Sequence, residues 1–448
     1  MNIRKYRRLI MGRVEVEAFF KERQMWAEDL DMEAELEKFI ESMHAGLRGS
    51  VPPESMRMIP TYLTVGEEFT TNDPVIVMDA GGTNFRICLT QFNEHGETEI
   101  SQFRQATMPG SNGEISAKEF YGFIADQLAP FLKYSRKIGF CFSYACDMLP
   151  SHDGRLINFT KEIQIPEAIG TVVGEEIMKV LEERGHKTDD IHFVMLNDTV
   201  AALLGGFSGG GSKQYSGYAG IILGTGINSA YIEQNSNINK LEGKLNPLGN
   251  MIINMESGDY SVSSRSPIDI EIDKATNVPG AQLMEKMISG RYLGLQVLYA
   301  VREAVADANL FSDFFKENFA EVYDLESAEL TEFVEEPYGP GILSQCCANE
   351  LDRENLYYII DNIFERAAML VTVIVAGIHI QTGVGKNPVR PLAITMEGST
   401  FYKANLLREK IKYHIQQFVN KKYGFYNEFL QVENANVIGS ALAALMNE

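Results

Sequence analysis

The sequence predicts a two-lobed α/β protein, and three observations carry this prediction. A chain of 448 residues is too long for one ordinary core, so two domains are expected. Strand-like runs alternate with helical patterns between Asp73 and about Gly206, which is typical of an α/β domain. A strand, a glycine turn and a second strand occur at residues 75–89 and again at 218–233. Two copies of one design, separated by a glycine- and serine-rich joint at 207–217, suggest related lobes across a cleft.

The first copy of this pattern reads VIVMDAGGTNFRICL. Its apolar start predicts a buried strand that ends at Asp79, where Gly81 and Gly82 force a tight turn into a second strand. Such a turn exposes backbone N–H groups and short polar side chains, which suit phosphate oxygens. A carboxylate at the strand end can hold a hydrated Mg²⁺ nearby. An ordinary glycine hairpin explains the same letters equally well, so later motifs must decide between the two interpretations.

The remaining elements follow from periodicity and from glycine and proline breaks. Helices dominate after Gly258, so the second lobe is expected to be helix-rich. The predicted helices are 1–48, 117–133, 175–184, 280–308, 353–382, 404–419 and 435–446; the predicted strands are 75–79, 85–91, 138–143, 191–196, 218–223 and 392–396; a hairpin is predicted at 93–96 and an extended linker at 56–64.

The charge and hydropathy of the sequence argue against nucleic acid and membranes as the main binding partners. A formal net charge of -21 and a pI of about 4.9 argue against nucleic acid or an anionic membrane as the main partner, although a local pocket can still bind ATP. The apolar run 367–380 is too short to span a bilayer and predicts a buried core helix. No apolar run follows the basic residues at 4–8, so no secretory signal is predicted and a cytoplasmic location is expected.

Cysteine and histidine usage points to a reducing compartment without a structural metal. The 5 cysteines include no C-x-x-C pair, which favours reduced, partly buried thiols. The 7 histidines are scattered and form no pair with metal-ligand spacing, so no zinc or other protein-held metal site is predicted.

Four polar motifs carry candidate chemistry, and each has a plainer explanation. MLNDT places Asn197 and Asp198 at a strand end; an Asp there suits a general base, and a helix cap is the alternative. NFTK offers Thr160 and Lys161 to a polar substrate, or forms a surface turn. The third motif is NME at 254–256. In PGAQLMEKMISG, Glu285 is predicted two turns into a helix, where a solvated helix face is the alternative.

In their order and number these motifs resemble the hexokinase family, within the superfamily of actin-like ATPases and sugar kinases. The resemblance covers most of the chain from residue 56 onward, and PGAQLMEKMISGRYLG is its most specific piece. The matching stretches are MIPTY (58–62), DAGGTNFR (79–86), FCFSYAC (140–146), INFTK (157–161), LNDT (196–199), LGTGINSAYIE (223–233), INMESG (253–258), PGAQLMEKMISGRYLG (279–294), FERAAMLVTVIVAGI (364–378) and MEGSTFYK (396–403).

The resemblance implies the actin-like, ribonuclease H-like fold with a central cleft. It implies a small lobe of residues 70–202 plus 433–448 and a larger, helix-rich lobe of residues 1–69 plus 203–432. It also implies transfer of the γ-phosphate of ATP to the 6-hydroxyl of a hexose. Glucose is the expected hexose, and mannose and fructose are further candidates; Mg²⁺ is the expected cofactor. Nothing in the sequence indicates the oligomeric state.

The resemblance also assigns roles residue by residue. Asp198 is the expected catalytic base, and Lys161 is expected to steady developing phosphate charge. The expected sugar contacts are Ser143, Thr160, Lys161, Asn197, Asp198, Asn228, Glu256 and Glu285. The first phosphate loop comprises Asp79, Gly81, Gly82, Thr83, Asn84 and Arg86; the second comprises Gly224, Thr225 and Gly226; Gly398 and Ser399 are expected to line the adenosine pocket.

The sequence departs from the family pattern at three places. None of them removes the base or the two phosphate loops, but they leave the rate, the preferred sugar and nucleotide contacts at the last turn unpredicted. Ile227 stands where the family has Thr, which removes one hydroxyl near the phosphates. Ser257 stands where the family has Trp, although Glu256 before it is kept. The turn at 433–439 lacks the family's glycine-rich character.

Two other functions fit parts of the sequence. A hexokinase-like protein that binds sugar for regulation would share the fold, because fold does not fix function. An actin-like or chaperone-type ATPase would need no sugar-contact residues, and Asn197-Asp198 together with PGAQLMEKMISG argues against it.

Overall fold

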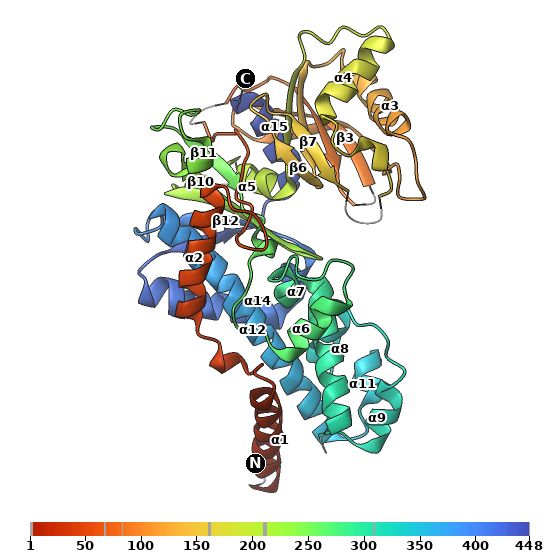
Figure 1. Cartoon of the computed structure of the whole chain (residues 1–448), viewed down its shortest axis with the longest axis vertical. Coiled ribbons are helices and arrows are strands. Elements are labelled where there is room, and N and C mark those ends of the chain that lie inside the picture. The colour runs from red at the N-terminus through yellow and green to blue at the C-terminus, as the bar shows by residue number, and fades with distance from the viewer. Residues whose placement is uncertain are drawn as a thin grey trace.

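The protein has two lobes, each built on a mixed β-sheet (Figure 1). The computed structural model describes residues 3–66, 69–82, 84–159, 163–208, 213–307 and 310–447. One lobe carries a five-stranded sheet, and the other carries a six-stranded sheet with most of the helices. The predicted two-lobed α/β architecture with a helix-rich larger lobe is therefore confirmed.

The two sheets repeat one topology. In the first sheet β2 pairs antiparallel with β3 and parallel with β5, while β4 and β8 extend the two edges. In the second sheet β9 pairs antiparallel with β10 and parallel with β12, while β11 and β13 extend the edges in the same way. The strands are β2 (Val75–Ala80), β3 (Asn84–Phe92), β4 (Thr98–Thr107), β5 (Lys137–Phe142), β8 (His192–Leu196), β9 (Gly217–Leu223), β10 (Ile227–Gln234), β11 (Asn250–Asn254), β12 (Leu392–Glu397) and β13 (Asn427–Leu430), with β1 (Ile59–Pro60) added beside β11.

This repetition confirms the sequence prediction of two copies of one design. The glycine turn before Asn84 joins the first two strands of one copy, and the turn at 224–226 joins the first two strands of the other. Equivalent turns in equivalent places lie at the ends of two separate sheets.

Two apolar helices, α5 (Asp198–Ser208) and α15 (Ala435–Met446), pack against each other between the sheets. α15 lies on β2 and β5, whereas α5 lies on β9. Glycine permits this close approach, because a Cβ at Gly439 would meet the Ala201 carbonyl oxygen at 1.9 Å. α5 runs across the predicted lobe boundary at 202, so the junction consists of packed helices.

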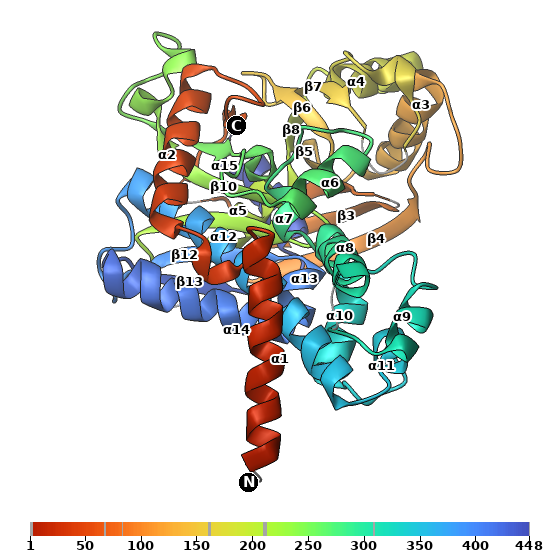
Figure 2. The ribbon, with the colours of Figure 1, turned by 60° about the horizontal axis from the view of Figure 1, so that its bottom comes forward.

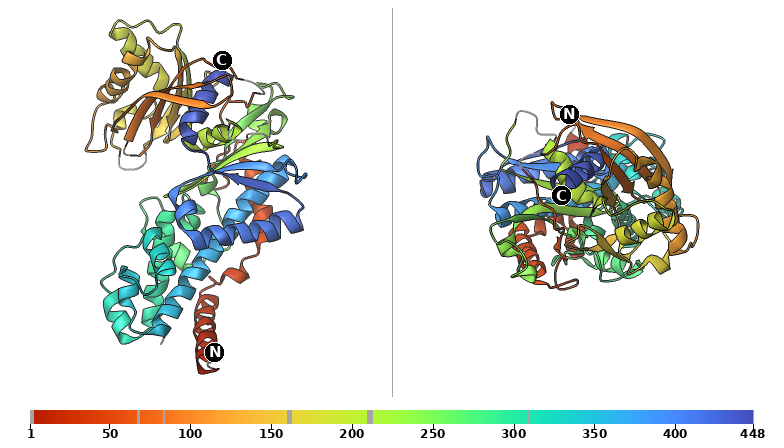
Figure 3. Two further views of the ribbon diagram at one scale, coloured as in Figure 1. Left: turned by 180° about the vertical axis from the view of Figure 1, so that it is seen from behind. Right: turned by 90° about the horizontal axis from the view of Figure 1, so that it is seen from above.

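The core of the larger lobe is α12 (Glu350–Thr382). By length and composition it could cross a membrane, but 89% of its most apolar window is buried inside the protein. The predicted core helix is thus confirmed. Around it pack α1 (Ile3–Glu22), α2 (Met32–Arg48), α7 (Glu285–Ile288), α8 (Gly290–Asp307), α10 (Ser327–Glu335) and α14 (Asn405–His414); α6 (Pro267–Ala275), α9 (Asp313–Phe319), α11 (Ile342–Cys346) and α13 (Ser399–Lys403) complete this lobe. The N-terminal part of α1 projects away from the body (Figure 2), and the left view of Figure 3 shows the N-terminus at the bottom and the C-terminus near the top.

The smaller lobe adds α3 (Ala117–Leu128), α4 (Val173–Glu183) and a hairpin of β6 (Ala145–Met148) and β7 (Gly154–Asn158) to its sheet. The turn predicted at 93–96 joins β3 to β4, and the Asn93 N–H donates to the Glu97 carbonyl oxygen at 3.0 Å. All 5 cysteines are free and buried.

Several predicted helix boundaries are wrong. The helix expected at 1–48 is two helices separated by a 3-10 turn at Ala27–Asp29, because the Asp31 side chain caps a new start. The helix expected at 117–133 ends at Leu128 and continues only as a 3-10 turn. The helix expected at 280–308 starts only at Glu285, because Gly280 and Gln282 have positive φ angles of 81° and 51°. α14 ends at His414 and passes into a π-helix over 415–422.

Candidate active site

A network of amides and one carboxylate lies where the two lobes meet. The Asn228 side-chain amide donates to Asn254 Oδ1 at 2.8 Å and approaches Asn197 Oδ1 at 3.4 Å and Glu256 Oε1 at 3.5 Å. The Asn254 amide in turn donates to Glu256 Oε1 at 2.7 Å. Asn197 precedes α5, whereas the other three belong to the larger lobe. Three predicted sugar contacts are thus brought together: the Asn228 amide reaches all the other members, and Asn254 bridges Asn228 and Glu256.

The backbone holds Glu256 in an uncommon conformation. Glu256 follows β11 with φ 53° and ψ 52°, in the left-handed region that non-glycine residues seldom occupy. The next turn is fixed by a hydrogen bond from the Asp259 N–H to the Glu256 carbonyl oxygen at 3.0 Å. Arg57 pairs with the Asp259 carboxylate at 3.0 Å. Backbone outliers of this kind cluster at functional sites, where surrounding contacts enforce them.

Glu285 reaches the same region from α7. Its carboxylate accepts the Ile227 N–H at 3.2 Å, directly after the second glycine turn. The neighbouring Lys286 is only 3% exposed and donates to Asp273 at 2.7 Å and to the Val278 carbonyl oxygen at 2.8 Å. This anchor fixes the short helix. Glu285 itself is partly buried and binds the Ile227 N–H, so the alternative of a solvated helix face does not hold for it. The sequence predicted that Glu285 lies two turns into a helix. This is wrong, because Glu285 is the first residue of α7.

Asp198 follows Asn197 at the start of α5, and its charge acts on Glu256 and on Asp79. The Asn197 side chain accepts the Thr199 N–H at 2.9 Å, so the helix-cap alternative holds for Asn197 while Asp198 begins α5. Desolvation raises the pKa of Asp79, and desolvation raises the pKa of Glu256 to about 7; in both cases the negative charge of Asp198 adds to the increase. Asp198 is therefore within electrostatic reach of both groups.

A small cavity of about 20 Å³ marks the junction of the lobes. It is lined from the smaller lobe by Phe142, Tyr144, Cys146, Met148, Met195, Leu196 and Asn197, and from the larger lobe by Ile59, Thr61, Asn254 and Glu256. Apolar walls with a few convergent polar groups are typical of ligand sites. The cavity is much smaller than typical ligand pockets of about 300–1,000 Å³, so it is too small for a hexose in this conformation.

The first phosphate turn follows β2. Asp79 is 8% exposed, and its carboxylate is 3.4 Å from the Arg86 guanidinium. The turn glycines present their carbonyl oxygens to the Tyr144 hydroxyl, which lies 3.3 Å from both the Gly81 and the Gly82 oxygen. Asn84 opens β3 and accepts a hydrogen bond from Gln105 at 3.0 Å. Asp79, Gly81, Gly82, Asn84 and Arg86 thus lie on one turn and the strands that flank it.

Four other predictions concern the same region. Ser143 directly follows β5, and its N–H donates to the Ala80 carbonyl oxygen at 3.2 Å, which holds it beside the phosphate turn. Thr83, Thr160 and Lys161 lie outside the described residues. Their roles as phosphate and sugar contacts therefore stay predictions.

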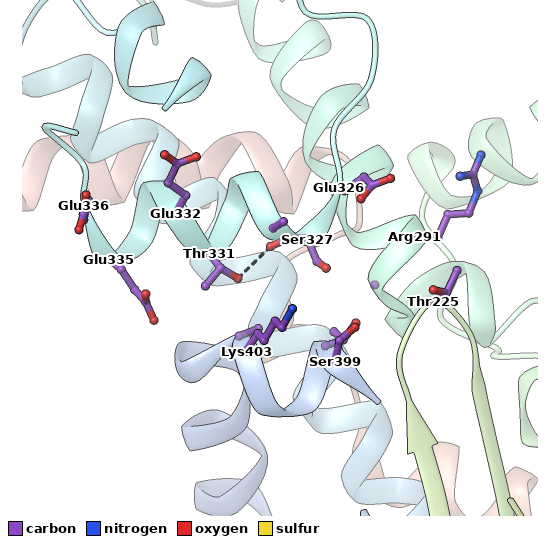
Figure 4. Close-up of a pocket in the computed structure, with 14 residues that line it drawn as sticks. Thr225, Arg291, Glu326, Ser327, Thr331, Glu332, Glu335, Glu336, Ser399 and Lys403 are labelled. Atoms are coloured by element: carbon purple, nitrogen blue, oxygen red, sulfur yellow. Dashed lines mark hydrogen bonds between the residues drawn. The ribbon is translucent and has the colours of Figure 1, made fainter. Parts of the chain in front are cut away.

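The second glycine turn forms one wall of a cavity of about 680 Å³ (Figure 4). The Gly224 carbonyl oxygen accepts hydrogen bonds from the Gly290 N–H at 2.8 Å and the Thr400 hydroxyl at 2.9 Å. Gly398 has a φ of 102°, and a Cβ there would lie 2.3 Å from the Leu223 carbonyl oxygen. Only glycine lets this loop reach the turn.

The lining of this cavity carries four glutamates: Glu332, Glu335 and Glu336 lie toward one end, and Glu326 lies near Arg291 toward the other. Its lining comprises Thr225, Gly290, Arg291, Glu326, Ser327, Ala328, Thr331, Glu332, Glu335, Glu336, Ser399, Thr400, Lys403 and Ala404. Figure 4 shows Thr225 and Arg291 at one end, Glu335 and Glu336 at the other, and Ser399 and Lys403 between them. Thr225, predicted in the second phosphate loop, and Ser399, predicted to line the adenosine pocket, therefore share one cavity, while Gly398 positions its wall.

Sequence profiles described as "Hexokinase" match this chain over residues 16–207 and 218–446. Hexokinase-5 of Oryza sativa subsp. japonica is 30% identical over 377 residues, which cover 78% of this chain and 72% of that protein. The chain belongs to the hexokinase family. Hexokinase-1 of Spinacia oleracea is 33% identical over 291 residues, covering 60% of this chain and 56% of that protein.

Solved hexokinase structures share the fold. A hexokinase from Schistosoma mansoni complexed with glucose superposes with a TM-score of 0.76 at 24% identity, over 98% of this chain and 99% of that chain. A second hexokinase crystal structure gives a TM-score of 0.75 at 20% identity. These likenesses support the fold of the hexokinase family over the whole length of the chain.

One departure from the hexokinase pattern has a structural explanation. Ile227, where the family has Thr, is 4% exposed, and its backbone N–H still binds Glu285. The apolar side chain is packed in the core, so the change removes a hydroxyl without opening a gap.

Sequence reasoning missed Asn254 and the acidic end of the large cavity. Asn254 stands in the INMESG motif, but strand periodicity alone assigns it a core position, and it is 5% exposed. Asn254 pairs with Ala230 of the neighbouring strand, and Ala230 is two residues from Asn228. This register lets the Asn254 side chain bridge Asn228 and Glu256. Glu332, Glu335 and Glu336 read as the solvated face of a helix, since no local signal places α10 beside the turn at Thr225.

Asn254→Leu is expected to weaken glucose binding about 10-fold, because Asn228 and Glu256 lose a shared partner. The hydrogen bond from Asn254 lowers the pKa of Glu256, so its loss moves the pH dependence of glucose affinity to higher pH. Titration calorimetry between pH 5.5 and 8.5 measures both effects. Asn237→Leu is a matched control, because its amide donates to Glu233 at 2.8 Å at the far end of the same sheet. Equal changes in the two variants would contradict the bridging role.

Proposed function

We propose that this protein is an ATP-dependent hexokinase that transfers the γ-phosphate of ATP to the 6-hydroxyl of a hexose, giving hexose 6-phosphate and ADP. The observation that supports the proposal is that Asp198 directly follows Asn197 of the sugar-contact network. The strand before it, β8, pairs with β5, which in turn pairs with β2 at Asp79. The charge of Asp198 acts on Glu256 and on Asp79. A base in that place can take a proton from a hydroxyl that faces a phosphate.

A hexose presents only hydroxyl groups, so its recognition needs carboxylates and amides. Glu256, Glu285, Asn197 and Asn228 supply these from both lobes. In the absence of sugar they partly satisfy one another, as in the 2.8 Å and 2.7 Å amide contacts through Asn254. A sugar that lacks one hydroxyl leaves a buried group unpaired, which is how such sites reject the wrong substrate.

The chemical step moves one proton and one phosphoryl group. Asp198 accepts the proton of the 6-hydroxyl while that oxygen forms a bond to the γ-phosphorus, and the bond from phosphorus to the β-phosphate oxygen breaks. The transition state of phosphoryl transfer is loose, so positioning and charge neutralisation contribute most of the acceleration. The predicted role of Lys161 is to steady the charge on the transferred group.

Asp79 fits the demands of Mg²⁺. Mg²⁺ keeps several waters and is bound through one or two carboxylates together with substrate phosphates. Asp79 offers one carboxylate at the end of β2, beside the turn proposed to hold the phosphates. When bound, the ion neutralises phosphate charge; Arg86, 3.4 Å from Asp79, can contribute to the same neutralisation.

The charge of the large cavity sets the direction of the nucleotide. Glu332, Glu335 and Glu336 would repel a triphosphate, so the phosphates are placed at the Thr225 end (Figure 4). Carboxylates at the other end can accept hydrogen bonds from ribose hydroxyls and from the adenine amino group. A volume of about 680 Å³ is sufficient for a nucleoside.

The proposed sugar contacts come from both lobes, so a bound hexose favours the arrangement in which the lobes are closed. Water is a competing acceptor at far higher concentration than the sugar, so a site assembled in advance would hydrolyse ATP. Closure on a bound hexose completes the site only when the acceptor is present.

The experiment that tests the proposal follows ADP release from ATP with and without glucose, mannose or fructose. Hexose-dependent ADP release with equal amounts of hexose 6-phosphate is expected, with little release in the absence of sugar. If glucose binds but no donor yields sugar phosphate, the regulatory alternative replaces the enzyme. ATP hydrolysis at an unchanged rate in every arm would favour a plain ATPase.

A further inference from the structure

Tyr144 touches both halves of the proposed reaction site with a single side chain. It is 4% exposed and lines the small cavity between the lobes together with Asn197 and Glu256. Its hydroxyl lies 3.3 Å from the carbonyl oxygens of Gly81 and Gly82 in the first phosphate turn. Tyr144 therefore joins this cavity to that turn through one side chain.

The ring of Tyr144 is held by two aromatic neighbours. Phe142 lies 4.9 Å away and Phe159 lies 5.1 Å away between ring centroids, both edge-to-face. Such contacts fix the direction of the hydroxyl. Phe159 also directly precedes Thr160 and Lys161, the predicted sugar contacts. Phe159 thus connects the Tyr144 ring by packing to the end of the described segment before these residues.

The Tyr144 hydroxyl acts as a donor. Burial raises the pKa of Tyr144 well above its usual range, so the group keeps its proton at any working pH. A carbonyl oxygen can only accept, and the single proton is shared between the Gly81 and Gly82 oxygens. This contact restrains the backbone of the turn whose N–H groups are proposed to face the nucleotide phosphates.

We propose that Tyr144 is a positioning residue that couples the hexose cavity to the first phosphate turn, so that a bound hexose tightens the binding of the nucleotide. The proposal rests on the proposed kinase function for the identity of the two ligands. A hexose in the cavity restrains the ring, and the hydroxyl then holds the turn in the conformation that binds phosphate. By linkage, the nucleotide tightens hexose binding by the same factor.

Tyr144→Phe tests this coupling, because it removes one oxygen and keeps the ring. The affinity for a non-hydrolysable ATP analogue with Mg²⁺ is measured with and without saturating glucose. In the parent protein glucose is expected to tighten binding, and in the variant this gain is expected to fall about 3- to 10-fold, the range for one hydrogen bond. The KM for ATP should rise by a similar factor, while glucose affinity without nucleotide stays unchanged.

Tyr121→Phe is the matched control. Tyr121 is a buried tyrosine of the same lobe, 2% exposed, and its hydroxyl pairs with Thr171 at 2.5 Å. A purely structural role of Tyr144 predicts that the two variants lose similar thermal stability and show the same ligand affinities. Equal coupling in both variants, or no effect of glucose on the analogue in the parent protein, would overturn the proposal.

The titrations with glucose and the ATP analogue test the role of Tyr144 independently of the kinase activity. A parent protein that makes no hexose phosphate contradicts the kinase activity, yet analogue and glucose titrations still decide whether Tyr144 couples the two sites. An active enzyme with unchanged coupling in Tyr144→Phe leaves the kinase proposal standing and removes the role of Tyr144.

Discussion

Asp198→Ala is expected to abolish measurable hexose phosphorylation while glucose binding survives. A positioned general base contributes about 10²- to 10⁴-fold to the rate, so kcat should fall by at least that factor. Glucose affinity should change little, because Asn197, Asn228, Glu256 and Glu285 still hold the sugar. A coupled assay for ADP gives kcat, and calorimetric titration with glucose gives the affinity.

Two further variants sharpen this test. Asp198→Asn keeps the size and the hydrogen-bonding oxygen but cannot take a proton, so it should be as inactive as the alanine variant. Asp190→Asn changes an exposed carboxylate of the same lobe that pairs with Arg136, and it should keep the activity of the parent. Turnover by Asp198→Asn within a few-fold of the parent would remove Asp198 from the role of base.

Glu256→Gln is expected to stabilise the sugar-free protein at alkaline pH while weakening glucose binding. Desolvation raises the pKa of Glu256 from 4.5 to about 7. The folded state therefore holds this proton more tightly than the unfolded state, and the carboxylate costs stability as the pH rises from about 4.5 through about 7. The cost is complete above that window, where it amounts to about 3 kcal/mol, and it is absent well below pH 4.5.

Thermal unfolding at two pH values measures this cost. At pH 8 Glu256→Gln should unfold about 3 °C above the parent for a chain of this length, and at pH 4.5 the difference should nearly vanish. Glu242→Gln, an exposed glutamate of the same lobe, should show no pH-dependent gain. Equal Tm values for the parent and Glu256→Gln at pH 8 would show that the folded protein does not disfavour the carboxylate.

Glucose titration completes the Glu256 prediction. A hydrogen bond to a charged group contributes about 1.5–3 kcal/mol, so the affinity of Glu256→Gln should fall about 10- to 100-fold. In the parent protein the sugar selects the carboxylate form, so binding at pH 6 should release a proton, and affinity should weaken as the pH falls. Titrations in two buffers of different ionisation enthalpy detect that proton, and Glu256→Gln should release none there.

Much of the fold followed from local patterns. Apolar runs ending at Asp79 and at Leu223, each followed by a glycine turn, located both sheets and their common design. The continuous apolar run at 367–380 located the core helix, because a helix buried on all sides needs no polar face. Boundaries failed where the backbone departs from the periodic pattern: α7 starts only at Glu285 because Gly280 and Gln282 before it take positive φ angles, and periodicity does not reveal a glutamine in that conformation.

The candidate site was predictable to the extent that its residues stand in motifs. Asn228, Glu256 and Glu285 were found through the family resemblance, and the fold places them around one junction. Asn254 and Tyr144 were missed as site residues, because their roles depend on the register between strands and on the packing of rings from separate elements. Local sequence carries no record of such distances.

The most direct test is a crystal structure of the protein with glucose, Mg²⁺ and a non-hydrolysable ATP analogue. The proposed mechanism predicts closed lobes, with the glucose 6-hydroxyl within about 2.6–3.2 Å of the Asp198 carboxylate and in line with the γ-phosphate. Asn228, Glu256 and Glu285 should contact the other hydroxyls. A complex that places glucose away from Asp198, or leaves these three residues without a sugar contact, would contradict the mechanism.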